Sequence, residues 1–141
     1  MTKLSVLLKT VAAVLLLQTF TINAYAQDNE NIHLLDGTTI NWTYRISGSG
    51  MTLSFDNGLA QYEWIKGSRK GRTAKDIPYQ SREISDNVFL LNWVQPEKPD
   101  FITLIFDFNK NVAFSSGLIG YGTDRQRNLF LDGTVESVVQ R

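Results

Sequence analysis

The sequence predicts an all-β domain, a single antiparallel meander that closes into a small barrel of about eight to nine strands. Three observations support this fold class. After residue 36 the apolar residues recur with a period of two rather than 3.6. Short turn sequences separate these runs at regular intervals, among them Asp56-Asn57-Gly58, Ser85-Asp86-Asn87 and Asn109-Lys110-Asn111. No long helical pattern interrupts them, and closure of such a meander would remove its exposed edges.

The first segment of the chain has the pattern of a leader. Lys3 and Lys9 precede an apolar run over 11–17, and Ala24 and Ala26 end the segment. A positive start, a short apolar stretch and small residues at the −3 and −1 positions are typical of a secretory signal peptide. A membrane anchor is less favoured, because polar residues dilute a stretch that barely reaches the roughly 17–20 residues of a span. We expect export to the periplasm or the extracellular space.

Three segments follow from this interpretation. Residues 1–26 are the cleaved signal peptide, residues 27–36 a polar, flexible arm, and residues 37–141 the β-barrel domain. The remaining chain has about the modal size of one domain. No integral membrane segment is expected after cleavage. Alternating patterns within the domain predict strands over 38–46, 51–56, 59–65, 75–84, 88–95, 101–108, 112–119, 128–131 and 134–139.

Proline and Asp-Gly positions add detail to these strands. Pro96 and Pro99 lie in a connection, and Pro78 indicates a bulge or a sheet edge, because proline cannot donate to a ladder. Asp132-Gly133 is expected to form a tight turn between the last two strands, since Asp-Gly is a strong hairpin dipeptide.

Charge argues against a nucleic-acid partner. The chain has 14 basic and 14 acidic residues, and loss of the two leader lysines leaves 12 against 14, a net charge of −2. Counterion release on nucleic acid needs a clustered basic surface. The one basic cluster is interrupted by glycines and is interpreted as a solvated hairpin rim; it comprises Lys66, Arg69, Lys70, Arg72 and Lys75.

Redox and metal chemistry find little support. The chain has no cysteine, so it has neither disulfides nor a thiol nucleophile. The single histidine, His33, lies in the expected arm, and no His/Cys cluster suits a metal. We expect no metal and no cofactor.

Strand parity selects the side chains that point inward. Trp42 and Tyr44 share one face of the first strand, and Trp93 and Gln95 share one face of the strand over 88–95. A small barrel has room either for its own side chains or for one small ligand. Aromatic walls with a few polar groups are what a small-molecule pocket requires.

The same residues carry a resemblance to known families. Asn41-Trp42-Thr43-Tyr44, the glycine-flanked Arg72 and Trp93-Val94-Gln95-Pro96 resemble three segments of phenolic acid decarboxylases: tyrosine-x-tyrosine, an arginine, and tryptophan-x-glutamate-proline. Chain size and the passage over 82–93 are more similar to MoaF-like domains. The resemblance covers roughly residues 37–118. It implies a lipocalin-like (calycin) barrel whose ligand-binding residues are Trp42, Tyr44, Arg72, Trp93 and Gln95.

Two of these positions depart from the decarboxylase pattern. The resemblance implies that the tyrosines and the arginine grip the polar end of the substrate, while the glutamate handles a proton. Here Trp42 replaces the first tyrosine and Gln95 replaces the glutamate. An amide cannot exchange a proton at usable pH, and general acid–base catalysis is typically worth 10²–10⁴-fold. We therefore assign no catalytic residue.

The sequence favours an exported, non-catalytic barrel that binds a small aromatic or amphipathic ligand, acidic ones included, in its lumen. One alternative is a lyase related to phenolic acid decarboxylases with an altered acid–base residue. A third is a structural or interaction module whose lumen is filled by its own side chains. The oligomeric state stays open, with a homodimer as one option.

Overall fold

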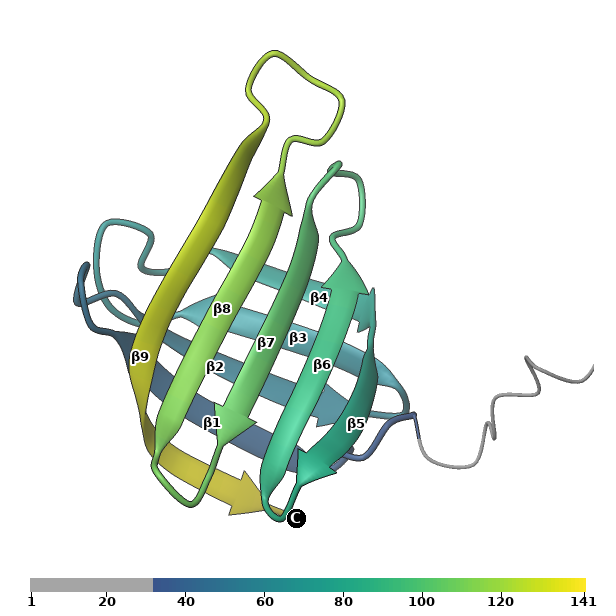
Figure 1. Ribbon diagram of the computed structural model, residues 1–141, viewed down its shortest axis with the longest axis vertical. Coiled ribbons are helices and arrows are strands. Elements are labelled where there is room, and N and C mark those ends of the chain that lie inside the picture. The colour runs from purple at the N-terminus through teal and green to yellow at the C-terminus, as the bar shows by residue number, and fades with distance from the viewer. Residues whose placement is uncertain (1–31) are drawn as a thin grey trace, which may run out of the picture. The chain divides into compact units, whose positions relative to one another are not determined.

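The computed structural model describes residues 32–141, which form one nine-stranded antiparallel sheet (Figure 1). The signal peptide predicted for residues 1–26 lies outside the described residues. Within residues 32–141 no helix has the length and apolar character needed to cross a membrane. The strands are β1 (Thr38–Tyr44), β2 (Gly50–Asp56), β3 (Leu59–Trp64), β4 (Thr73–Pro78), β5 (Gln80–Ser85), β6 (Val88–Val94), β7 (Phe101–Asp107), β8 (Val112–Ile119) and β9 (Arg127–Gln140).

The sheet curls into an open half-barrel, which corrects the expected closed barrel. Its strand order is β4-β3-β2-β1-β9-β8-β7-β6-β5, so β4 and β5 are the two edges (Figure 1). Only Tyr79 separates these edge strands in sequence. One residue is too short for a hairpin loop, so the chain bends at Tyr79 and changes its ladder partner from β3 to β6. The predicted strand over 75–84 is therefore two strands, β4 and β5, and these two strands are not hydrogen-bonded to each other.

The hairpin predicted at Asp132-Gly133 is wrong. Both residues lie inside β9, which pairs with β8 through its first half and with β1 through its second. A Cβ atom at Gly133 would lie 2.6 Å from the carbonyl oxygen of Thr43. This glycine therefore permits a close approach of two backbones instead of forming a turn.

The turns at three other predicted hairpins are confirmed. Asn57 and Gly58 have φ values of 51° and 74°, the left-handed pair that a type I′ turn requires between β2 and β3. Asn87 and Asn111 are also left-handed, with φ values of 54° and 52°. Pro78 ends the edge strand β4, as its missing N–H predicted.

A packed core fills the end of the half-barrel at which β1 begins. Burial alternates along β1, so Ile40 and the two residues that follow at every second position face inward. Aromatic rings contact one another here, as Phe55 and Tyr79 do with ring centroids 4.6 Å apart. Side chains from both halves of the sheet contribute to this core, including Leu35, Ile40, Leu53, Phe55, Ala60, Ile77, Tyr79, Leu91 and Phe106.

The described part of the predicted arm is held against this core. Leu35 is only 2% exposed, and the Leu34 amide donates to Ser81 Oγ at 2.8 Å. Asp36 accepts a hydrogen bond from the Tyr79 hydroxyl at 2.9 Å. Residues 34 and 36 are thus held to the domain by specific hydrogen bonds.

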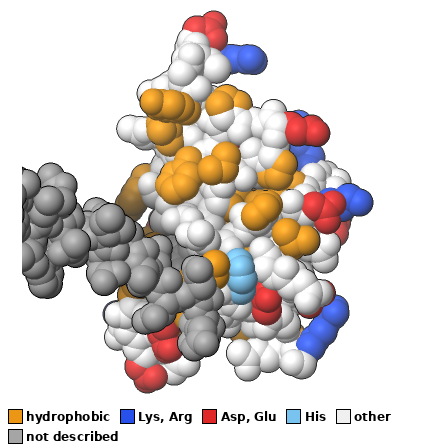
Figure 2. Space-filling view, turned by 90° about the vertical axis from the view of Figure 1, so that its right-hand side faces the viewer, with side chains coloured by type: hydrophobic (Ala, Val, Ile, Leu, Met, Phe, Trp, Pro, Cys, Tyr) orange, Lys and Arg blue, Asp and Glu red, His pale blue; other side chains and the backbone are white. Residues whose placement is uncertain are grey.

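The outer face of the sheet carries exposed apolar side chains. Figure 2 shows hydrophobic side chains gathered on the face that is turned toward the viewer. Val94 is 61% exposed and stands opposite Phe101, which is 43% exposed, in the β6–β7 ladder. Phe114 on β8 and Phe130 on β9 are exposed as well. These strands therefore have apolar residues on both faces.

Candidate functional site

A cavity of about 670 Å³ lies at the end of the half-barrel opposite Leu35. Three connections at this end contribute to its rim: Ser49 follows β1, Arg69 follows β3 and Gln95 follows β6. Ile119 at the end of β8 and Arg127 at the start of β9 also line it. Inward side chains of the strands form the walls. The apolar lining consists of Trp42, Met51, Trp64, Trp93, Ile102, Leu104, Ile119, Leu129 and Leu131.

All five residues that the sequence analysis selected line this cavity, namely Trp42, Tyr44, Arg72, Trp93 and Gln95. The two tryptophans, the tyrosine and the glutamine are buried, whereas Arg72 is exposed. Trp64 also lines the cavity, so every tryptophan of the three-tryptophan chain does. Strand parity correctly predicted which side chains of β1 and β6 come together.

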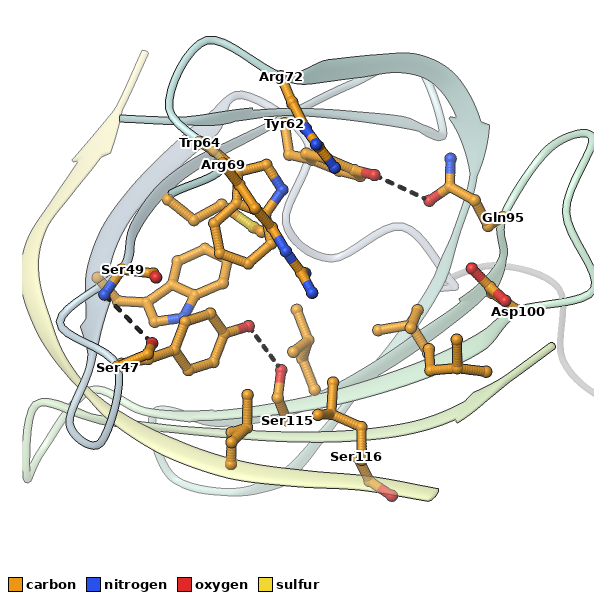
Figure 3. Close-up of a pocket in the computed structure, with 18 of the residues that line it drawn as sticks. Ser47, Ser49, Tyr62, Trp64, Arg69, Arg72, Gln95, Asp100, Ser115 and Ser116 are labelled. Carbon is orange, nitrogen blue, oxygen red and sulfur yellow. Dashed lines mark hydrogen bonds between the residues drawn. The ribbon is translucent and has the colours of Figure 1, made fainter. Parts of the chain in front are cut away.

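Tyr44 and Ser115 form a buried polar pair on the cavity wall. The Tyr44 hydroxyl lies 2.9 Å from Ser115 Oγ, and either group can donate (Figure 3). Burial raises the pKa of the Tyr44 phenol, and the Ser115 hydrogen bond only partly offsets this effect. Tyr44 is therefore a neutral phenol at physiological pH, and one hydroxyl proton of the pair stays available for a ligand.

Tyr62 and Gln95 form a second polar pair. The Tyr62 hydroxyl donates to Gln95 Oε1 at 3.3 Å (Figure 3). Burial also raises the pKa of the Tyr62 phenol. The backbone amide of Gln95 donates to the carbonyl oxygen of Asp100 at 2.9 Å, which closes the proline-containing connection and fixes the glutamine.

Asp100 is the one carboxylate among the described residues that line the cavity. Its Oδ1 accepts a hydrogen bond from the Gly120 amide at 2.8 Å. The Tyr121 amide also donates to the Pro99 carbonyl oxygen at 2.7 Å. Asp100 thus joins the β6–β7 connection to the β8–β9 loop, and its side chain lines the cavity (Figure 3).

The β3–β4 connection presents two arginines. The Gly71 amide donates to the Trp64 carbonyl oxygen at 2.8 Å, and the Arg72 amide donates to the Arg69 carbonyl oxygen at 3.0 Å. Gly67 has a φ of 87°, and a Cβ atom there would lie 2.5 Å from Ser49 Oγ. Both arginine side chains reach into the cavity (Figure 3). Both are exposed, as the interpretation of this cluster as a solvated rim predicted, and they also line the cavity.

The cavity has an excess of positive charge. Among residues 32–141, four cationic side chains line it, Arg69, Arg72, Lys98 and Arg127, against the single carboxylate of Asp100. The three ion pairs found within residues 32–141 involve none of these four cations. Clustered charge of one sign in a concave, partly apolar site attracts an oppositely charged ligand.

The described residues do not provide the groups of a metal site. In the described part of the chain, no three His, Cys, Asp or Glu side chains are close enough to hold a metal ion. Within the same residues, the buried indole nitrogens of Trp42 and Trp93 have no hydrogen-bond partner. The arrangement can hold an apolar body between rings and aliphatic side chains, and can bind an anion with arginine and hydroxyl donors.

Sequence reasoning missed several polar residues of the site, among them Tyr62, Arg69, Asp100 and Ser115. Parity could have found two of them, because Tyr62 lies between inward-facing Ala60 and Trp64, and Ser115 lies between Ala113 and Gly117. The position of Arg69 depends on the path of a loop, which no periodic pattern encodes.

Comparisons with known proteins place the chain in context. A family model described as MoaF-like matches residues 36–123, more than half of the chain. A crystal structure from Burkholderia vietnamiensis, described as a candidate beta-lactamase, superposes with a TM-score of 0.62 at 17% sequence identity. That match covers 74% of this chain and 95% of the other, and identity this low concerns the fold alone. No curated protein matches the chain.

Proposed function

This chain belongs to the MoaF-like family, and we propose that its half-barrel binds a small, anionic, amphipathic molecule without transforming it. The observation that carries the proposal is the cavity of about 670 Å³, with aromatic walls and four cations against one carboxylate. Ligand pockets typically measure about 300–1,000 Å³, so this cavity suits one small molecule. Its volume also argues against a module whose lumen is filled by its own side chains.

The walls support an amphipathic ligand. Tyr44 and Trp64 present rings whose centroids are 5.9 Å apart, and Trp42 meets Tyr44 edge-on at 5.8 Å. Aliphatic side chains of β7, β8 and β9 lie among the other lining residues. Such surfaces bind the apolar body of a ligand, while a few polar groups fix its orientation.

Binding without catalysis is supported by the state of Gln95. The side-chain oxygen of Gln95 accepts a hydrogen bond from the Tyr62 hydroxyl. An amide cannot act as a general acid or base. Asp100, the one carboxylate on the cavity wall, already accepts the Gly120 amide. The lyase alternative would have to use this carboxylate, and turnover of a hydroxycinnamate would reveal it.

Export remains part of the proposal. It rests on the leader pattern of residues 1–26, which ends in Ala24-Tyr25-Ala26. N-terminal sequencing of the protein purified from the periplasm or medium of a bacterial host should start at Gln27. An intact N-terminus in the cytoplasm would contradict export.

Tryptophan fluorescence is a direct test of binding, because all three tryptophans line the cavity. We expect cinnamate, p-coumarate or ferulate to change the emission saturably, with no loss of the compound from its absorbance spectrum. Neutral aromatics of the same size should bind more weakly. Loss of the hydroxycinnamate would favour the lyase, and the absence of both signals would overturn the proposal.

A further inference from the structure

We infer that Arg69 receives the anionic group of the ligand, and that the ligands are monocarboxylates held with the charged end inside the cavity, beside Tyr44 and Ser115. This inference rests on the proposed function and deepens it. It gives the bound molecule an orientation, with the carboxylate between the β3–β4 connection and β8. It also assigns the anionic group to Arg69 and not to the three other cations that line the cavity, Arg72, Lys98 and Arg127.

Arg69 is an exposed residue whose guanidinium lies over the ring of Trp64. Its guanidinium carbon lies 4.9 Å from the centroid of the Trp64 ring. Figure 3 shows the side chain entering the cavity from the β3–β4 connection and ending on the side of the Tyr44–Ser115 pair, whereas Arg72 stays beside Tyr62. Stacking on an indole holds a guanidinium in a defined plane and leaves its N–H groups at the edge free to bind a carboxylate with two hydrogen bonds.

The donors of Arg69 have no competing acceptor among residues 32–141. The ion pairs there join Arg45 to Asp132, Lys66 to Glu136 and Lys110 to Asp107. A guanidinium that lines a cavity without a carboxylate partner is ready to bind an anionic ligand.

Electrostatic effects on two phenols agree with this placement. Burial raises the pKa values of Tyr44 and Tyr62, and the positive charge of Arg69 lowers each of them in part. Arg69 is thus close enough to act on the hydroxyls of both polar pairs. An anion bound to Arg69 would lie within reach of the spare hydroxyl proton of the Tyr44–Ser115 pair.

Asp100 opposes a second negative charge at the end of the ligand that lies beside it. Its carboxylate lies on the cavity wall, on the side of Gln95 (Figure 3). A second carboxylate at the distal end of a ligand would meet this like charge in a partly apolar site, which is unfavourable. The space between the two ends is lined by Ile102, Leu104, Leu129 and Leu131, which suit an apolar body.

The test is calorimetric titration with cinnamate and with cinnamamide, which has nearly the same shape but no charge. We expect wild type to bind cinnamate at least about 10-fold more tightly than the amide, and Arg69→Gln to weaken cinnamate by about 10- to 100-fold with little effect on cinnamamide. Lys70→Gln is the matched control: it removes the same charge from the same loop, but its side chain does not line the cavity. It should change either affinity by less than about 2-fold.

A dianion tests the role of Asp100. We expect 4-carboxycinnamate to bind wild type at least about 10-fold more weakly than cinnamate, and Asp100→Asn to narrow this gap. Asparagine keeps an oxygen that can accept the Gly120 amide, so the loop should be retained.

The outcomes separate this inference from the proposed function. If Arg69→Gln is folded by circular dichroism and still binds cinnamate as wild type does, Arg69 is not the anion receptor, although the cavity binds. If wild type binds cinnamate and cinnamamide equally, the preference for an anion is refuted. If wild type binds neither compound, both the inference and the proposed function fail.

Discussion

At the scale of single residues, the Tyr44–Ser115 pair has a measurable role in stability. Both side chains are buried and their oxygens lie 2.9 Å apart. Tyr44→Phe or Ser115→Ala leaves the other hydroxyl without its partner, so each variant should lose about 1–3 kcal/mol of unfolding free energy. The double variant should lose less than the sum of the two. Urea denaturation of the four proteins measures this coupling, and strictly additive losses would show that the hydrogen bond contributes nothing.

Gln95→Glu probes the charge balance of the cavity. A carboxylate at this buried position adds a negative charge to the wall beside Tyr62. We expect it to weaken cinnamate by about 3- to 10-fold at pH 8 through repulsion. Protonation of the new carboxyl at lower pH should restore affinity. Tighter binding at pH 8 would contradict a site built for anions, and loss of p-coumarate in this variant alone would identify a disabled lyase scaffold.

The sequence could predict the site residues that lie on regular strands, but not those that are positioned by a loop. Trp42, Tyr44 and Trp93 occupy alternating positions on regular strands, so period-two parity alone selected their face. Arg69 is positioned by a loop whose path depends on Gly67, Gly71 and a contact with Trp64. Local sequence indicated the exposed basic cluster, but it did not show the path of the loop that brings Arg69 over the Trp64 ring.

At the scale of elements, Gly133 permits the close pairing of β9 with β1. An added Cβ would lie 2.6 Å from the Thr43 carbonyl oxygen, and a backbone atom cannot move aside easily. We expect Gly133→Ala to lose at least about 2 kcal/mol of unfolding free energy. Gly117→Ala is the control on neighbouring β8, where the nearest atoms are the flexible ends of Ile102 and Ile119 at 3.2 Å.

Thermal and urea denaturation of these two variants compare the positions directly. Gly117→Ala should stay within about 1 kcal/mol of wild type, since side-chain tips can adjust. Equal stability of the two variants would contradict the close approach of the β9 and β1 backbones at Gly133.

Strand boundaries were predicted well where an element keeps one pair of neighbours. The prediction failed where a strand exchanges partners, at Tyr79 between β4 and β5 and at Asp132-Gly133 inside β9. Residues 75–84 alternate without a break in sequence, so nothing local marks the bend. Asp-Gly has the composition of a hairpin turn, and only the approach of Thr43 explains why the glycine lies in a strand.

At the scale of the whole molecule, buried tyrosines set the alkaline limit of stability. Burial is the largest cause that raises the pKa values of Tyr44, Tyr62 and Tyr79 above the ordinary value of 10.0, and for Tyr79 the hydrogen bond to Asp36 adds to it. A raised pKa in the folded state leaves stability unchanged while both states are protonated. Stability is then lost as the pH rises above about 10, because the unfolded chain ionises first.

The melting temperature should therefore not respond to these phenols below about pH 9 and should fall above pH 10. Tyr79→Phe should reduce the slope of this fall. A melting temperature that rises between pH 10 and pH 11 would contradict the burial of these phenols.

The open half-barrel divides the molecule into a packed end and a hollow end. The packed end uses large apolar residues from β1, β2, β4, β6 and β7, and Leu35 closes it. At the hollow end, small residues such as Ser49 and Ser115 lie between the aromatic side chains of the cavity wall. The same curled sheet thus provides both a stable core and a concave, positively charged site.

The most direct test of this account is a nitrogen–proton NMR titration of the protein with cinnamate. The chain has three indole N–H groups, and all three belong to the cavity. We predict that their three signals shift saturably with one common dissociation constant, together with backbone amides of the β3–β4 connection. Unchanged indole signals at saturating cinnamate, or shifts confined to the outer face of β6–β9, would contradict a ligand site inside the half-barrel.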